Sequence, residues 1–359
     1  MPDPGTVSSL VSARPIIKID DKENPILSQG LLSMLVEENT QGMCRCELVF
    51  GNWGTKGNAV DFLYFDRQIL DFGKKVSIEA GEGDTQSRIF YGRLTAIEAH
   101  YPTERPPDLL IMAEDSLQLM RMVRRTRSFE KVSDSDVIKE VAKDYSLKTS
   151  LDIDGPTYHV VTQVNQSDLA FLRERARAID AELWIDDKTI HVQARSRRKT
   201  SDITLTYPTG LKEFSVTADL ANQCTSLVVG GWDVSGKESI VYTADDSVIK
   251  SELDNRESGS SILKKAFEER VDRIVHLSPH NKEEAEYAGK SHYRMKARRF
   301  ITGRGYSDGD GRLKVGVSLK LEGLGDLFDG KYYVAEVRHV FDLKNGYRTY
   351  FKVERPGLK

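Results

Sequence analysis

Hydrophobic and polar positions alternate with a period of two through much of the first third of the chain, which predicts β-strands. In Arg45 to Leu48 the alternation is strict, as in a strand with one solvated face. Short apolar runs separated by turn residues continue to Asp115. We therefore predict a first β-barrel module at residues 14–115, preceded by a flexible N-terminus at residues 1–13.

A helical period replaces the strand pattern after this module. Ser133 and Asp136 imitate a capping box at the start of one helix. A second helix begins at Asn165 or Ser167, with apolar residues at spacings of three and four, and a hairpin follows it. Two helices and a hairpin predict an α/β insert at residues 116–200.

Strand patterns resume in the last part of the chain. A polar stretch at residues 242–261 is expected to be exposed and mobile. Helical patterns follow at residues 262–274 and 281–300, the latter capped by Asn281. We predict a second β-barrel module at residues 201–359, with inserted helices at about 258–300. The predicted fold class is mainly β (α+β), with two related β-barrel modules and an α/β insert.

The two modules are predicted to be copies of one pattern. LDFGKKVSIEAG, which begins at Leu70, is echoed by LKVGVSLKLEGLG, which begins at Leu313. Further echoes join residues 92–101 to residues 330–340, with the offset slipping by a few residues as loop insertions would cause. His100 and His339 fall at matching places in this alignment, which suggests a structural role for each. Chance similarity of glycine-bounded strands is the alternative.

Composition narrows the functional classes. The 359 residues are 39% hydrophobic and 30% charged, which is ordinary for a globular protein. Lys and Arg number 52 against 55 Asp and Glu, which argues against a dedicated nucleic-acid binder. The chain lacks a long apolar run and a signal-peptide pattern, so we expect synthesis in the cytoplasm and no membrane span. The three cysteines do not suggest a disulfide or a metal site.

Motifs of catalysis and metal binding are absent from the sequence. The seven histidines have no metal-ligand spacing, and there is no HExxH or GxSxG. Glu114 and Asp115 are neighbours on one strand, so they cannot face each other across a cleft as glycoside hydrolysis requires. The Gly-rich segment 302–313 lacks the remaining residues of a phosphate or calcium loop, and a loop before a strand is the better interpretation. We expect no catalytic residues, no metal and no cofactor.

Arginine-rich runs occur at residues 121–127, 194–199 and 294–300. They could line a channel for DNA. Nearby acids nearly cancel their charge, which favours solvated faces or salt bridges between subunits, and no specific nucleic acid is expected.

Four stretches give the chain a resemblance to a known family. They are Arg45 to Gly54, Val164 to Asp187, Asp219 to Asp233, and Leu321 to Gly357. Together they resemble the phage late control D family, baseplate hub proteins related to the N-terminal part of VgrG spike proteins. VgrG proteins continue into a spike, whereas this sequence stops at Lys359. Either hub and spike are separate polypeptides, as we expect, or the sequence is cut at the boundary between them.

The resemblance implies a VgrG-like or tail-hub-like fold and a structural role. The expected protein is a homotrimer in a contractile phage tail or phage-tail-like injection system, joining the hexameric inner tube, or a tube-initiator protein, to a separate trimeric spike among other baseplate proteins. Leu324, Leu327 and Phe328 are candidate interface residues, although they could instead plug their own barrel end. A tail-tip enzyme that degrades cell walls and a channel protein that binds DNA are the alternatives. The sequence does not distinguish a phage from a bacteriocin, an extracellular injection system or a type VI apparatus.

Overall fold

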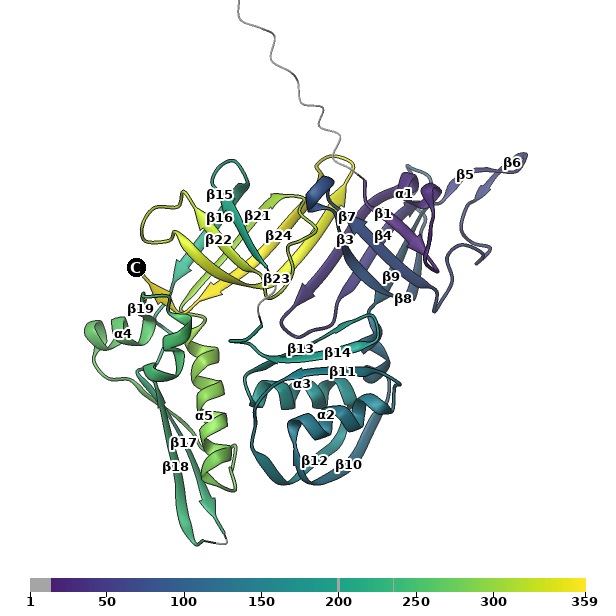
Figure 1. The fold of residues 1–359 in the computed structure, drawn as a ribbon. Coiled ribbons are helices and arrows are strands. Elements are labelled where there is room, and N and C mark those ends of the chain that lie inside the picture. Colours follow the sequence, from purple (N-terminus) through teal and green to yellow (C-terminus); the bar gives the residue numbers. More distant parts are fainter. Residues whose placement is uncertain (1–13, 199–200, 235) are drawn as a thin grey trace, which may run out of the picture.

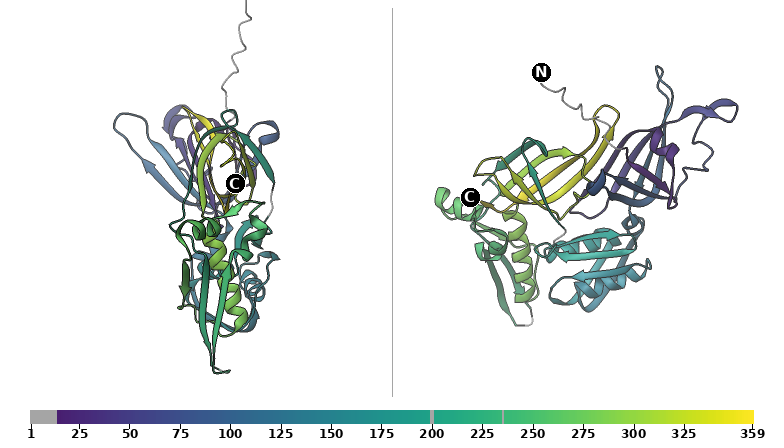
Figure 2. Two further views of the ribbon diagram at one scale, coloured as in Figure 1. Left: turned by 90° about the vertical axis from the view of Figure 1, so that its left-hand side faces the viewer. Right: turned by 45° about the horizontal axis from the view of Figure 1, so that its top comes forward.

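Two β modules lie side by side in the computed structural model, and two smaller units hang from the same side of them (Figures 1 and 2). The structure describes residues 14–198, 201–234 and 236–359. The predicted flexible N-terminus lies outside these residues. The predicted fold class, mainly β with two related β modules and an α/β insert, is confirmed.

The first module buries its apolar residues inside a curved sheet. Leu48, Phe50, Ile78 and Ile111 belong to this core and are fully buried. The elements of the first module are β1 (Ile16–Ile19), β2 (Lys22–Glu23), α1 (Pro25–Gly30), β3 (Leu31–Asn39), β4 (Arg45–Gly51), β5 (Trp53–Lys56), β6 (Ala59–Phe62), β7 (Lys75–Ala80), η1 (Gly83–Thr85), β8 (Ser87–His100) and β9 (Asp108–Glu114).

The α/β unit, residues 116–198, follows directly. Ser133 caps its first long helix by a capping box with Asp136, and Ser167 caps the second, as predicted. The hairpin is also present. The elements are η2 (Ser116–Arg121), β10 (Arg124–Ser133), α2 (Asp134–Lys143), β11 (Lys148–Asp152), β12 (Thr157–Ser167), α3 (Asp168–Ala178), β13 (Ala181–Asp186) and β14 (Thr189–Ala194). The pair β10–β12 was not foreseen, because its polar and apolar residues alternate over two largely exposed faces.

The second module is interrupted by the second inserted unit, residues 219–300, in which one face of a small sheet packs on the long helix α5. The strands of the module are β15 (Asp202–Thr206), β16 (Leu211–Ala218), β21 (Ile301–Asp308), β22 (Ser318–Glu322), β23 (Gly330–Asp342), β24 (Gly346–Arg355) and β25 (Gly357–Leu358). The inserted unit contains β17 (Ser226–Asp233), β18 (Glu238–Asp245), η3 (Asp246–Glu252), β19 (Glu257–Ser258), α4 (Gly259–Phe267), β20 (Val271–Ile274) and α5 (Lys282–Ala297).

Several element predictions in this last part were wrong. The polar stretch 242–261 is ordered into β18, η3 and β19, and it buries Ile249 completely. The predicted helix at 262–274 ends at Phe267, and its last residues form β20 because Val271 to Ile274 pair in parallel with β17. Residues 301–308 form the strand β21, where a loop was expected. The helix capped by Asn281 is confirmed: the amide of Glu284 donates to its Oδ1 at 2.8 Å.

One continuous sheet joins the two modules. Strand β23 of the second module pairs with β3 of the first, with Arg338 opposite Glu37 and Phe341 opposite Met34. The bulged residue Ala335 marks the point where the neighbour of β23 changes from β22 to β3, and its carbonyl accepts a hydrogen bond from Thr40 N at 3.1 Å. Phe341 therefore belongs to the core of the first module.

The repeat predicted from the sequence is present in the topology. The order β3–β4–β9–β8–β7–β1 in the first module corresponds to β16–β21–β24–β23–β22–β15 in the second. The outermost strand differs: β1 pairs with β7 antiparallel, and β15 pairs with β22 in parallel. In the first module β3 and β4 are joined by a short turn, whereas the second inserted unit separates β16 from β21.

Hydrogen bonds fix the alignment of the two copies. Gly73 N donates to Leu94 O at 2.8 Å, and Gly316 N donates to Val334 O at 3.0 Å. Both glycines have positive φ, 78° and 92°, a conformation that favours glycine. A bulge follows immediately in each copy, between Leu94 and Ala96 and between Val334 and Glu336. The offset of 243 residues at the glycines is thus confirmed.

The two predicted equivalent histidines do not match in the structure. Leu94 corresponds to Val334, so His100 is equivalent to Val340, one residue away from His339. His100 is exposed, whereas His339 is 4% exposed. The ring of His339 faces the core, where Nε2 donates to Leu313 O at 3.1 Å and Nδ1 accepts from the hydroxyl of Tyr347 at 2.8 Å.

His339 should make stability depend on pH. Burial lowers the pKa of His339 to about 4, below the value of about 6.5 for an unfolded chain. The contribution of neutral His339 to the free energy of unfolding is therefore fully present above pH 6.5. About 2 to 3 kcal/mol of it is lost as the pH falls towards 4. We expect His339→Gln to flatten the stability profile over that range, measured by urea unfolding. His159→Gln is the control and should leave the profile unchanged, because His159 is exposed and removing it takes away no ion pair within the described residues. Parallel wild-type and His339→Gln profiles would contradict this assignment.

Candidate functional site

The predicted interface residues lie in the loop between β22 and β23. Leu324 and Phe328 are partly buried against the core of the second module, and Leu327 is 47% exposed. Arg355 fixes the loop by donating to the carbonyl oxygens of Leu327 at 2.9 Å and Asp329 at 3.1 Å. Two of the three side chains thus cover their own module, and Leu327 is the one that is free to contact a partner.

An aromatic arm, residues 52–66, projects from the other end of the molecule (Figure 1). Its strands β5 and β6 pair with each other and with no other described strand. Phe62 packs edge-on against Trp53 with ring centroids 4.9 Å apart, and it stacks on Phe65 at 4.6 Å. The outer residues are exposed, Trp53 by 45% and Tyr101, which packs beside the arm, by 62%.

Sequence reasoning missed this arm, although the repeat contained the signal. Residues 52–74 connect β4 to β7, whereas residues 309–317 make the equivalent connection from β21 to β22. The second module shows that a much shorter segment is sufficient for the fold. The longer connection carries exposed aromatic residues, which are typical of contact surfaces.

A further apolar surface lies on the second inserted unit. Helix α5 covers one face of the β17–β18–β20 sheet. The other face exposes Trp232, Val241 and Val271 by 56%, 61% and 48%. Figure 1 shows that β17 and β18 extend as a hairpin away from the modules.

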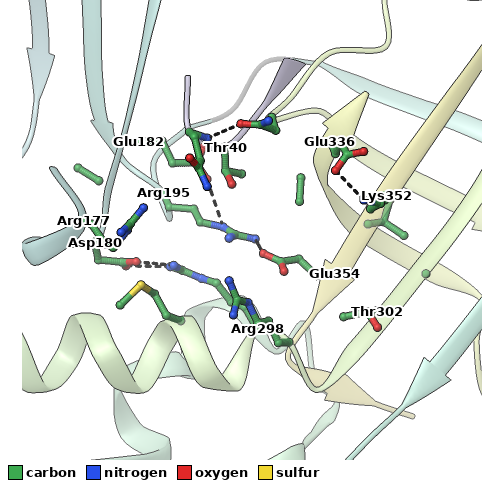
Figure 3. A pocket seen from close by; sticks show the side chains of 18 of the residues that line it. Thr40, Arg177, Asp180, Glu182, Arg195, Arg298, Thr302, Glu336, Lys352 and Glu354 are labelled. Carbon is green, nitrogen blue, oxygen red and sulfur yellow. Dashed lines mark hydrogen bonds and ion pairs between the residues drawn. The ribbon is translucent and has the colours of Figure 1, made fainter. Parts of the chain in front are cut away.

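The units meet at a buried ionic junction. Arg298, at the end of α5, is 1% exposed. Its Nη2 donates to Asp180 Oδ2 at 2.8 Å, and its Nε donates to Glu252 Oε2 at 2.7 Å (Figure 3 shows the Asp180 pair). Burial alone would lower the pKa of Arg298, but these two carboxylates hold it well above its usual value. The guanidinium therefore stays charged and joins α3 to α5.

A second buried network joins the α/β unit to the second module. Glu182 on β13 accepts from Arg198 Nη1 at 2.8 Å and from the hydroxyl of Tyr333 on β23. Burial, followed by the charge of Glu182, raises the pKa of Tyr333 well above its usual value. Arg195 completes the connection by pairing with Glu354 of β24.

Most arginines of the arginine-rich runs form ion pairs with acidic residues of the same chain. Arg125 and Arg127 pair with Asp144 and with the fully buried Asp168. Arg198 and Arg298 belong to the two junction networks. These salt bridges lie within one chain. The prediction from the sequence was solvated faces or salt bridges between subunits.

A cavity of about 870 Å³ lies where the α/β unit, the second inserted unit and the second module meet (Figure 3). Both networks reach its walls through Asp180, Glu182, Arg195 and Arg298. Its walls are charged, and its lining combines residues that are far apart in the chain. None of these lining residues was singled out in the sequence as a binding residue.

Residues 14–198, 201–234 and 236–359 contain no recognisable metal site and no helix that could span a membrane. No group of three or more His, Cys, Asp or Glu side chains in these ranges could hold a metal ion. The two aspartates of the Gly-rich segment are paired with basic residues of the chain. Arg312 Nη2 donates to Asp310 Oδ2 at 2.7 Å, and Lys212 pairs with Asp308 at 2.9 Å. Within the same ranges no helix is long and apolar enough to cross a membrane.

Comparison with known proteins gives a family match and several structural matches. A family model described as the Alg8 N-terminal domain matches residues 16–342. No curated protein sequence matches the chain significantly. The matching family model is not the phage late control D family. Membership of the late control D family therefore stays a prediction from the sequence.

Solved structures share the fold over nearly the whole chain. The 43 kDa tail protein of prophage MuSo2 from Shewanella oneidensis has a TM-score of 0.69 at 13% identity, with 96% of this chain and 98% of that chain covered. A tail protein from Neisseria meningitidis has a TM-score of 0.68 at 10% identity, covering 95% and 96%.

A third structure, from Escherichia coli, is described as a type VI secretion component with structural similarity to the T4 bacteriophage tail proteins gp27 and gp5. Its TM-score is 0.58 at 12% identity, with coverage of 94% of this chain and 76% of that chain. The similarity of these structures confirms the predicted tail-protein-like fold.

Proposed function

This chain belongs to the family described as the Alg8 N-terminal domain, and from its fold we propose that it is a structural baseplate hub of a contractile phage tail or phage-tail-like injection system. In this role it is made in the cytoplasm and becomes part of the particle. Its partners are the hexameric inner tube or a tube-initiator protein, a separate trimeric spike and other baseplate proteins. Two solved structures with this fold are tail proteins, which supports the proposal.

The duplicated module is the observation that carries the proposal. Two six-stranded units with the same strand order lie side by side in one sheet. Three chains arranged about a threefold axis would present six similar units, which match a sixfold tube on one face while keeping threefold symmetry for the spike. A single duplicated chain thereby solves a symmetry mismatch.

The role we propose is mechanical and not catalytic. The ionic junction and the shared sheet connect the parts of one chain, so that force applied to one module is transmitted to the other. The competing role, a wall-degrading enzyme, predicts that purified protein clears a peptidoglycan suspension. We expect no clearing.

The proposal is tested by the mass of the purified protein in solution. Light scattering on the chain alone, and then mixed with the candidate spike protein, should give a threefold mass in at least one condition, since some ring proteins assemble only with a partner. A monomer in both conditions would overturn the hub assignment.

Substitution in the aromatic arm should weaken the trimer. We propose that the arm contacts the next chain of the ring, because exposed aromatic clusters supply much of the energy of protein contacts. Phe65 is 39% exposed, and its ring contacts are with Phe62 of the arm and with the exposed Tyr101 beside it, so Phe65→Asp should leave the core of the module intact. We expect about tenfold weaker trimerisation, equivalent to about 1.4 kcal/mol, measured by sedimentation equilibrium.

A matched control is available at the turn between β23 and β24 of the second module. Leu343 in this turn is 59% exposed. Leu343→Asp adds the same charge and should leave trimerisation unchanged. Equal affinity for the wild type and Phe65→Asp would exclude the arm from the subunit contact without affecting the light-scattering test.

A further inference from the structure

The charged cavity at the junction has a floor and two walls of different origin. The floor is one face of the second module, where two rows of side chains run across β16, β21 and β24. The first row is Ser215, Arg304 and Lys352, and the second is Thr217, Thr302 and Glu354. The α/β unit supplies one wall through α3 and β13, and the end of α5 supplies the other (Figure 3).

The acidic residues of this cavity already have basic partners. Asp180 binds Arg298, and Glu182 binds Arg198. On the floor, Glu336 accepts from Lys352 at 2.8 Å and Glu354 pairs with Arg195. The charge of each of these four carboxylates is therefore balanced by a basic residue other than the remaining arginines of the cavity.

Four arginines lining the cavity make no ion pair with any residue in the described ranges: Arg173, Arg177, Arg299 and Arg304. The Nε atom of Arg173 is buried and has no hydrogen-bond partner among those residues. Burial lowers the pKa of Arg173, the nearby charge of Asp115 offsets part of this effect, and the charges of Arg177 and Arg121 lower the pKa further. Arg304 stands directly opposite Lys352 across the two strands. Lys352 is paired with Glu336, so Arg304 is the one of these two cations that has no carboxylate partner among the described residues.

We propose that this cavity binds an acidic, extended segment of a partner protein, whose carboxylates pair with Arg177, Arg299 and Arg304. Arginine is well suited to carboxylates because its planar guanidinium donates two parallel hydrogen bonds. A volume of about 870 Å³ is in the range of sites that hold compact ligands. This inference depends on the cavity and not on the trimer.

The shape of the floor favours a strand. Strand β16 is the last strand of the large sheet, and its outer edge pairs with no other described strand. Ser215 and Thr217, both exposed, point from this strand into the cavity. A peptide added along such an edge gains main-chain hydrogen bonds and directs every second side chain to the same face. The segment should therefore carry acidic residues at alternate positions.

A single-stranded nucleic acid fits the cavity less well. Its binding sites combine positive charge with aromatic side chains on which bases stack. The lining contains no aromatic residue among those described, and its four carboxylates interrupt the positive surface. Discrete carboxylates on a peptide can reach the free arginines and avoid those acids.

The test uses a fluorescein-labelled peptide of eight residues with glutamate at every second position. Fluorescence anisotropy at low and moderate salt should show binding that weakens with salt, as expected of exposed charge pairs. The variant Arg177→Glu/Arg304→Glu should bind the peptide about tenfold more weakly or worse, because two attractive pairs become repulsive. Both residues are exposed and make no ion pair within the described chain, so the variant should fold.

The control variant has the same change in net charge outside the cavity. Arg270 and Arg273 are exposed on the second inserted unit and do not line the cavity. Arg270→Glu/Arg273→Glu should change peptide affinity by no more than about twofold. A deoxythymidine oligonucleotide with four phosphates, matched in charge to the peptide, should bind more weakly than the peptide.

Three outcomes would each overturn the proposal. They are failure of the wild-type protein to bind the peptide at millimolar concentration, equal weakening in the two double variants, and tighter binding of the oligonucleotide than of the peptide. None of them bears on the light-scattering mass, so the hub assignment and the cavity assignment fail independently.

Discussion

Arg298→Met is expected to destabilise the junction by about 3 to 5 kcal/mol, because it removes the main partner of the buried carboxylate of Asp180 and of the partly buried carboxylate of Glu252. Asp180 is 7% exposed, and both its Oδ atoms bind Arg298. Burial alone would raise the pKa of Glu252, and Arg298 holds that pKa below its usual value. Removing the guanidinium therefore removes most of the compensation for burying these charges, because the contact that Asp180 keeps is the longer one with Arg294 at 3.5 Å.

The expected loss is local, so the measurement must be local. Native-state hydrogen exchange should show faster exchange at the C-terminal end of α5 and in the turn after α3. Arg304→Met is the matched control, because it removes an arginine that is exposed and makes no ion pair in the described ranges. It should change stability by less than about 0.5 kcal/mol. Similar protection of the junction in the wild type and Arg298→Met would contradict the assignment.

The repeat and the helix caps could be predicted because they depend on local chemistry. Gly73 and Gly316 are required by a positive φ in equivalent turns, and a glycine is visible in a sequence. Ser133, Ser167 and Asn281 cap helices through hydrogen bonds to the residue three positions further along the chain. Such signals survive in a sequence because both partners are close along the chain.

The junction and the cavity could not be predicted because their partners are far apart in the chain. Arg298 and Asp180 are separated by 118 residues, and nothing in either neighbourhood points to the other. In the sequence, an arginine that is buried and paired, as Arg298 is, cannot be distinguished from an arginine that is exposed and unpaired among the described residues, as Arg299 is. Only the packing of three units around one cavity separates these cases.

The aromatic arm shows a different limit. Its length follows from the unequal connections of the two copies, but the similarity between the copies begins only after this segment, at Leu70. Trp53 and Phe62 also have the composition of an ordinary buried hairpin, and their exposure follows from the absence of any described strand beside β5 and β6. A repeat is therefore informative where its copies differ as well as where they agree.

Gly42→Ala is expected to cost about 3 to 5 kcal/mol and to loosen the α/β unit from the first module. Gly42 lies in the turn between β3 and β4 with φ of 89°. A Cβ atom at this position would lie 1.6 Å from the carbonyl oxygen of Leu183 on β13. Neither backbone can move easily, because Met43 in the same turn packs into the core of the α/β unit and Thr40 donates to Ala335.

Gly57→Ala is a control that introduces the backbone strain of a positive φ without a steric clash such as that between Gly42→Ala and Leu183. Gly57 also lies in a hairpin turn and has φ of 65°, but a Cβ atom there would have nothing within 4 Å. This control should cost about 1 kcal/mol, the strain of a positive φ alone. Urea unfolding gives the difference between the two variants, and limited proteolysis between Asp115 and Arg124 reports whether the α/β unit has loosened. If the two variants lose the same stability, the contact between Gly42 and Leu183 does not hold the unit in place, and the ionic networks must position it without that turn.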